Sequence, residues 1–172
     1  MVEIDPKRSA QMSRIRSANT RPELVVRKAL HSKGFRFRLH RKDLPGNPDI
    51  VLPRYRAAVF IHGCFWHQHP GCRLASWPKS GTEYWGPKLR RNVERDVQAA
   101  RQLQEHGWRP IIVWECDTRS PERLAARVEE LVLEILDSTH DAHGGELQRL
   151  FGGPRMTPAR NGGDDINDEI VT

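Results

Sequence analysis

The segment from residue 62 to residue 72 constrains this chain most, because eleven positions hold three histidines and two cysteines. A third cysteine, Cys116, lies far downstream. An odd number of cysteines argues against a disulfide framework and favours metal binding. Tetrahedral Zn²⁺ is held by thiolates and imidazoles, and Cys64, Cys72 and Cys116 with one histidine supply that donor set. Four protein ligands leave no open position, so the pattern predicts a structural zinc ion.

We expect His69 to be the fourth zinc ligand, in the pattern Cys64-x4-His69-x2-Cys72. His62 and His67 compete for this role on spacing alone. Three buried cysteines without a metal are the alternative, because free cysteine is among the most buried residue types. Zinc accounts better for the histidines, and it would hold together residues 63–86, which have no clear hydrophobic period.

Hydrophobic periodicity predicts a mixed α/β fold. A capping box at Thr20 and Glu23 begins a helix that ends at Gly34. Strands are predicted at residues 35–39, 49–52, 57–62 and 109–115, and further helices at 87–106 and 120–137. This order predicts a short mixed sheet flanked by helices, in one domain over residues 20–137.

Charge is unevenly distributed along the chain. Residues 138–172 hold six acidic and three basic residues and few large apolar ones, so we expect a disordered acidic tail. The whole chain carries +6, so residues 1–137 carry +9, a charge that suits a polyanionic partner and equally a merely solvated surface. The first 19 residues are a basic arm or a frayed terminus, and Arg14 and Arg16 in it are candidate DNA contacts.

The chain lacks a membrane-length apolar stretch, and its first residues lack the apolar core of a secretory signal. We therefore expect a cytoplasmic protein without a membrane partner.

Asp49 and the end of the following strand predict a second metal site. Many nucleases hold Mg²⁺ with a carboxylate at the start of one strand and with groups that end the next, because phosphodiester hydrolysis needs a hard cation. The usual acid-x-Lys of the second strand is here Phe60-Ile61-His62, so a second acid and a lysine are missing. On spacing alone, Asp49 is equally a turn residue after Pro48.

The string HGCFWHQHPGC, with LPGNPDIV before it and KLRRNVERD and IIVWEC after it, resembles the very short patch repair (Vsr) endonucleases. The likeness runs from about Met12 to Asp137 in matching order, and it departs where Pro70-Gly71 interrupts the family's histidine run. It implies a restriction-endonuclease-like fold of the PD-(D/E)xK type in which histidine chemistry replaces the missing acid and lysine. It also implies a structural zinc, catalytic Mg²⁺, and a monomer that nicks one strand of duplex DNA 5′ of the thymine of a T:G mispair. A mismatch-repair protein is a candidate partner that the sequence itself does not identify.

Residue roles follow from the resemblance by position. Asp49 and the backbone carbonyl of Ile61 would bind Mg²⁺. His67 would be the general base, oriented by Glu23, and His62 would act near the scissile phosphate and leaving group. On the residues alone, Glu23 is equally a helix-capping residue, and His62 is equally a hydrogen-bonded histidine at a strand end.

Asn92 and Asp96 lie one turn apart on the predicted long helix, where Asp96 interrupts the apolar stripe. A buried carboxylate there needs a partner. One interpretation is a pair within the helix, with Lys88, Arg91 or Arg95. The other, which the resemblance also implies, is support of the Mg²⁺ site by Asn92 and Asp96.

Aromatic residues in the irregular segment are expected to contact DNA. We expect Phe65, Trp66 and Trp85 on a loop, where they would wedge between base pairs of an easily opened mispair. Trp77 has no assigned role, and Trp108 and Trp114 are expected in the core.

A zinc-stabilised DNA-binding module without catalysis is the alternative function. It accounts for charge, cysteines and aromatic residues, but not for Asp49, Glu23, His62 and His67 together. An HNH-type nuclease is excluded because its second histidine and asparagine are missing at the expected spacing from His62.

Overall fold

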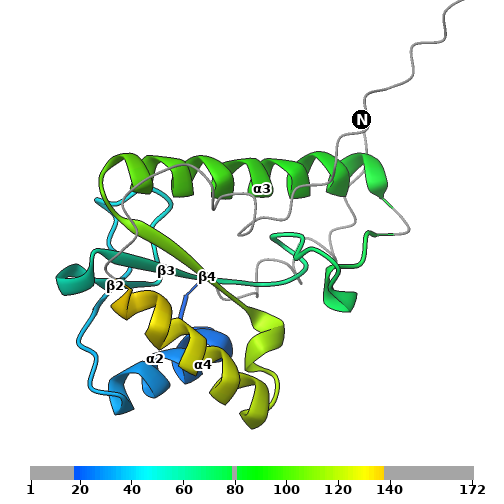
Figure 1. Cartoon of the computed structure of the whole chain (residues 1–172). Coiled ribbons are helices and arrows are strands. Elements are labelled where there is room, and N and C mark those ends of the chain that lie inside the picture. The colour runs from blue at the N-terminus through cyan, green and yellow to red at the C-terminus, as the bar shows by residue number, and fades with distance from the viewer. Residues whose placement is uncertain (1–17, 79–80, 138–172) are drawn as a thin grey trace, which may run out of the picture.

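The computed structural model describes residues 18–78 and 81–137 (Figure 1). Within these ranges four strands form one sheet: β1 (Arg38–Leu39), β2 (Ile50–Leu52), β3 (Ala57–His62) and β4 (Arg109–Trp114). The α-helices are α2 (Arg21–Ser32), α3 (Thr82–Glu105) and α4 (Pro121–Leu136), and short 3₁₀ segments are η1 (Pro53–Tyr55), η2 (Arg73–Ala75) and η3 (Glu115–Thr118). Most of the predicted basic arm, with Arg14 and Arg16, and the predicted acidic tail lie outside the described residues.

The sheet is mixed, as the sequence predicts. Strands β1, β2 and β3 pair antiparallel in sequence order. Strand β4 pairs parallel to β3, with Val59 opposite Ile111, because α3 carries the chain back across the sheet. Helix α3 covers one face, and α2 and α4 cover the other (Figure 1). The α/β architecture of the sequence analysis is confirmed.

Alternate residues of the inner strands fill two separate core layers. Ile50, Leu52 and Val59 pack with residues of α2 and α4 such as Leu30 and Leu131. The intervening Val51, Ala58 and Phe60 pack on the opposite face with Leu103 of α3. Because strand side chains alternate between faces and both faces are covered, these strands read as continuous apolar runs.

Strand β1 is shorter than the predicted strand at residues 35–39. The Phe35 amide donates a hydrogen bond to the Leu30 carbonyl at 3.1 Å, so this residue closes the end of α2 and does not extend the strand. Its ring is buried in the core beneath α2 and α4.

Helix α3 begins at Thr82, five residues before the predicted start at Pro87. The N-cap is Gly81, in the left-handed region at φ 65°. Proline favours a first turn because it lacks an amide hydrogen, but here Pro87 lies inside the helix, where one backbone hydrogen bond is lost. The earlier start places Trp85 on the helix and not on the predicted loop.

None of the helices in the described part of the chain has the length and apolar character needed to span a membrane.

The loop between β1 and β2 packs against α3 through Gly46. Its φ of +75° lies in the left-handed region, and a Cβ there would lie 2.7 Å from Ala99 Cβ and 3.0 Å from a Phe60 ring carbon. A side chain at residue 46 would therefore push the loop that leads to Asp49 away from α3.

Gly46→Ala is expected to lower the free energy of unfolding by about 2–5 kcal/mol, from left-handed strain and overpacking together. Gly34→Ala is the matched control: its φ is +88°, but no atom lies within 4 Å of the added Cβ, so we expect only about 1–2 kcal/mol. Urea denaturation of both variants measures the difference. Equal losses would contradict the packing role of Gly46.

Candidate functional site

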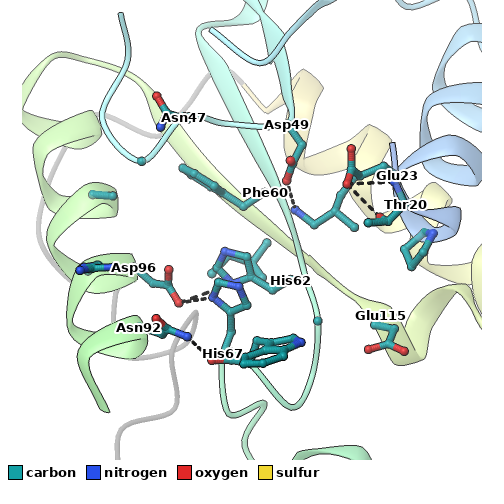
Figure 2. A pocket seen from close by; sticks show the side chains of 18 of the residues that line it. Thr20, Glu23, Asn47, Asp49, Phe60, His62, His67, Asn92, Asp96 and Glu115 are labelled. Atoms are coloured by element: carbon teal, nitrogen blue, oxygen red, sulfur yellow. Dashed lines mark hydrogen bonds and ion pairs between the residues drawn. The ribbon is translucent and has the colours of Figure 1, made fainter. Parts of the chain in front are cut away.

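A cavity of about 900 Å³ opens beside the end of β3, between the loop that follows it, α3 and the start of α2 (Figure 2). Four carboxylates line it: Glu23, Asp49, Asp96 and Glu115. Of these, Glu23 and Asp49 have carboxylate oxygens within 4.8 Å of one another, a spacing that favours a cation between them. In a chain of net charge +6, this acidic cavity is a feature that composition alone does not predict.

Asp49 immediately precedes β2 and is held against β3. The Ile61 amide donates a hydrogen bond to Asp49 Oδ2 at 2.7 Å (Figure 2). Burial raises the pKa of Asp49 to about 6, although this hydrogen bond lowers it, and the nearby Glu23 charge raises it further. The carboxyl group is therefore desolvated but positioned, as a cation ligand needs to be.

Glu23 reaches the same region from the first turn of α2, where it is 3% exposed. It accepts a hydrogen bond from the Thr20 backbone amide at 3.3 Å, which belongs to the predicted capping box, and another from the Asn19 amide at 3.0 Å. Carboxylate and imidazole atoms of Glu23, His40 and Asp49 lie within 4.8 Å of one another. Glu23 therefore lies in the same cluster of possible metal ligands as Asp49.

Our expectation that Glu23 orients His67 is wrong in this structure. Among the described residues, Glu23 has no hydrogen bond or ion pair with His67. Its remaining partners are Arg27, whose Nη2 donates to Glu23 Oε2 at 2.5 Å, and His40, whose Nε2 lies 3.9 Å from Glu23 Oε2 and 3.0 Å from Arg27 Nη2. Sequence analysis missed Arg27 and His40. The i, i+4 spacing of Glu23 and Arg27 could have predicted that they pair on one face of the helix. The approach of His40 depends on the tertiary fold, so no local sequence pattern predicts it.

The carboxylate that contacts His67 is Asp96 of α3. His67 Nδ1 lies 2.5 Å from Asp96 Oδ2 (Figure 2). In the described residues no ion pair joins Asp96 to Lys88, Arg91 or Arg95, so the interpretation as an intrahelical pair is wrong. A contact made across the cavity explains why a carboxylate interrupts the apolar stripe of α3.

His62 lies beside this pair at the end of β3. Its ring stacks on the His67 ring, with centroids 3.9 Å apart and planes 11° apart. His62 Nδ1 lies 4.0 Å from Asp96 Oδ2. Burial lowers the pKa of His62 well below its usual 6.5, so the ring is neutral near pH 7.

Asn92 fixes the loop that carries His67. Its side-chain amide donates a hydrogen bond to the Trp66 carbonyl at 3.1 Å. Asn92 and Asp96 thus hold adjacent loop residues against one face of α3. Their support of a metal site stays a prediction.

A second cluster lies away from the cavity, where the loop after β3 meets η3. Ligand atoms of Cys64, His69, Cys72 and Cys116 all lie within 4.8 Å of one another. His69 Nδ1 is 3.6 Å from Cys64 Sγ and 3.3 Å from Cys116 Sγ. Of the three histidines that competed on spacing, His69 is therefore the one that joins the cysteines.

Trp114 lies between the two clusters. Its ring stacks on His69 with centroids 4.1 Å apart, and it meets His62 edge-on at 5.5 Å. The expectation that Trp114 is a core residue is wrong, since it is only half-buried. Glu115 beside it, which the sequence analysis also passed over, accepts a hydrogen bond from the Cys64 amide at 3.3 Å.

The expected aromatic residues form one group. Phe65 and Trp66 meet edge-on with centroids 5.2 Å apart, and Trp66 and Trp85 are 5.9 Å apart. Phe65 and Trp66 are half-buried, but Trp85 is 5% exposed, which corrects its expected place on an open loop. The ammonium of Lys88 lies 5.6 Å from the centre of the Trp66 ring, a cation–π contact that sequence reasoning missed.

A small mixed sheet with helices on both faces, a cavity lined by carboxylates and histidines, and a Cys/His cluster fits the α/β nuclease fold. The comparisons give the particular family. A family model described as DNA mismatch endonuclease Vsr matches residues 3–73. The chain is 40% identical to the DNA mismatch endonuclease Vsr of Escherichia coli over 141 residues, 82% of this chain and 88% of that protein. The chain belongs to the Vsr family and is a DNA endonuclease.

Two nicking enzymes are also similar. The type II nicking enzyme V.XorIIP of Xanthomonas oryzae is 50% identical over 126 residues, 73% of this chain and 92% of the relative. V.NmeAIP of Neisseria meningitidis is 44% identical over 132 residues, 77% and 94% of the two chains. The alternative of a DNA-binding module without catalysis is therefore wrong.

Arg27→Met is expected to destabilise the fold by about 3–5 kcal/mol, because it leaves the buried Glu23 carboxylate without its cation. The side chains of this pair are 10% and 4% exposed. The double variant Glu23→Gln/Arg27→Met should lose less than Arg27→Met alone, since no buried charge remains. Urea denaturation measures both, and additive losses would contradict a buried charge pair.

Proposed function

We propose that this endonuclease is Mg²⁺-dependent and nicks one strand of duplex DNA 5′ of the thymine of a T:G mispair. The observation that carries the proposal is the cavity itself, where the His67–Asp96 pair faces the carboxylate site of Asp49. A phosphodiester group carries negative charge, so these carboxylates would repel it unless a cation lay between them.

The donor set at Asp49 fits Mg²⁺. Carboxylate and carbonyl oxygens are its preferred protein ligands, and Asp49 and the Ile61 carbonyl would hold it with Glu23 nearby. A bound Mg²⁺ would polarise the scissile phosphate and stabilise the leaving alkoxide. The hydrogen bond from the Ile61 amide supports this role, because it ties Asp49 to the residue whose carbonyl would share the ion.

His67 would act as the general base. With Nδ1–H donating to Asp96, the neutral ring keeps a lone pair on Nε2 that can take a proton from water. Asp96 would therefore act as the positioning residue for the base, in place of Glu23. His62 would lie near the leaving group as a neutral ring, since burial lowers its pKa.

The grouping of Phe65, Trp66 and Trp85 supports recognition of a mispair. Such rings stack on opened base steps, and a T:G pair costs less to open than a matched one. Buried Trp85 would brace the other two. Arg14 and Arg16 of the N-terminal arm remain proposed phosphate contacts, outside the described residues.

The donor set of the Cys/His cluster fits a structural zinc ion, with three thiolates and an imidazole and no place for substrate. Burial raises the pKa of the Cys64 thiol, and a cation would offset this by favouring the thiolate. We also propose a monomer with one endonuclease domain over residues 20–137, acting in the cytoplasm with a mismatch-repair partner.

Nicking of a duplex with one T:G mispair tests the proposal. With each strand labelled in turn, we expect Mg²⁺-dependent cutting 5′ of the thymine, none in EDTA, and little on the matched duplex. Asp49→Asn should abolish nicking and keep affinity for the duplex in Ca²⁺, whereas Asp43→Asn, an exposed carboxylate of the same loop, should leave both unchanged. Wild-type nicking by Asp49→Asn would place the active site elsewhere.

The Mg²⁺ requirement should depend on pH. Because the pKa of Asp49 is about 6, its carboxylate is ionised above that pH, and protons compete with the cation below it. The Mg²⁺ concentration for half-maximal nicking should rise about tenfold per unit below the pKa. A constant Mg²⁺ requirement from about pH 5 to pH 8 would refute the assignment of Asp49.

Purified protein should contain about one zinc per chain. Cys72→Ala should lose both zinc and cooperative unfolding, whereas His67→Ala should keep both, because His67 faces the cavity. Elemental analysis and thermal unfolding measure these outcomes. A zinc-free protein that unfolds cooperatively would contradict the structural metal.

A further inference from the structure

His62, His67 and Asp96 form a third donor set within the cavity. One ligand atom from each lies within 4.8 Å of the others. His62 is 5% exposed, and its Nδ1 is buried and has no hydrogen-bond partner among the described residues. In Figure 2 the His62 and His67 rings lie together and face the Asp96 carboxylate. A buried polar nitrogen without a partner costs free energy, which a ligand on it would recover.

We propose that His62, His67 and Asp96 form a binding site for a borderline divalent cation such as Zn²⁺ or Co²⁺, and that its occupation inhibits nicking. Imidazole nitrogens suit these ions, whereas Mg²⁺ prefers oxygen. The donor set differs from the oxygen-rich set at Asp49 and from the sulfur-rich set at Cys64. Three donors of this kind favour a borderline cation over Mg²⁺ and hold it less tightly than the four ligands of the Cys/His cluster would.

The site has to open slightly to accept an ion. Nearly parallel rings 3.9 Å apart cannot both direct an in-plane lone pair at one point. His67 can turn, since it lies on a loop with 27% of its side chain exposed, and the terminal ring torsion of histidine is broad. Turning His67 breaks its stacking on His62, and this cost weakens cation binding. The site should therefore fill only after the Cys/His cluster.

Inhibition follows from the tautomer of His67, and this step rests on its proposed role as general base. In the neutral ring Nδ1 carries the proton, which faces Asp96, and Nε2 carries the free lone pair. When a cation takes the Nδ1 lone pair, the proton moves through solvent to Nε2. The ring then stays neutral but has no lone pair left for the proton of water. His67 would then remain in the cavity but could not act as a base.

Cobalt binding to zinc-replete protein without DNA tests the site by visible absorption. We expect Co²⁺ to add d–d bands without a thiolate charge-transfer band, because no sulfur is among the ligands. His62→Phe, which keeps the packed ring, and Asp96→Asn should each weaken binding by about tenfold or more. His31→Gln, which removes an exposed histidine of α2, is the control and should bind as the parent does.

The outcomes separate this site from the proposed nuclease mechanism. Absence of cobalt bands in zinc-replete protein, or equal bands in His62→Phe, would overturn the site whatever the nicking assay shows. If Co²⁺ fills the site, nicking of the T:G duplex at saturating Mg²⁺ should fall in parallel with the rise of the bands. An unchanged rate at full occupancy would overturn the inhibitory role.

Discussion

The contact between His67 Nδ1 and Asp96 Oδ2 ties the irregular loop after β3 to the long helix α3, and the form of the cavity depends on it. The contact joins a loop position to a rigid element, so the imidazole is oriented by a helix that the core already fixes. Asn92, one turn earlier on α3, holds the same loop through the Trp66 carbonyl. Together they hold His67 and Trp66 at fixed places in the cavity that Asp49 also lines.

The loop after β3 also places two histidines that are close in sequence in different clusters. His67 faces Asp96 and His69 joins the cysteines, and Gln68 between them has a φ of 49°. A non-glycine residue in the left-handed region is strained, and such strain is common at functional sites. The left-handed backbone at Gln68 allows the short segment around it to contribute a histidine to each of two donor sets. Beyond His69, this segment is held by the Cys/His cluster.

Much of the fold could be predicted because its signals are local. The capping box at Thr20, the apolar run of β3 and the soft donors around residue 64 each depend on neighbours in the sequence. Most of the predictions that failed concerned tertiary contacts between elements. The partner of Asp96 comes from another element, and Glu23 pairs with Arg27 and not with His67. Proline at residue 87 marked a helix start that in fact lies at Thr82, so Trp85 was placed on a loop.

The central claim is that an acidic cavity in a basic chain acts as a phosphodiesterase through a histidine whose tautomer Asp96 sets. Single-turnover nicking of a T:G duplex by Asp96→Asn tests it most directly, because an amide can donate to Nδ1 as well as accept from it and so no longer fixes the Nδ1–H tautomer. The account predicts a rate lower by about two to four orders of magnitude, with duplex affinity in Ca²⁺ and zinc content unchanged. A rate within about twofold of the parent would contradict it.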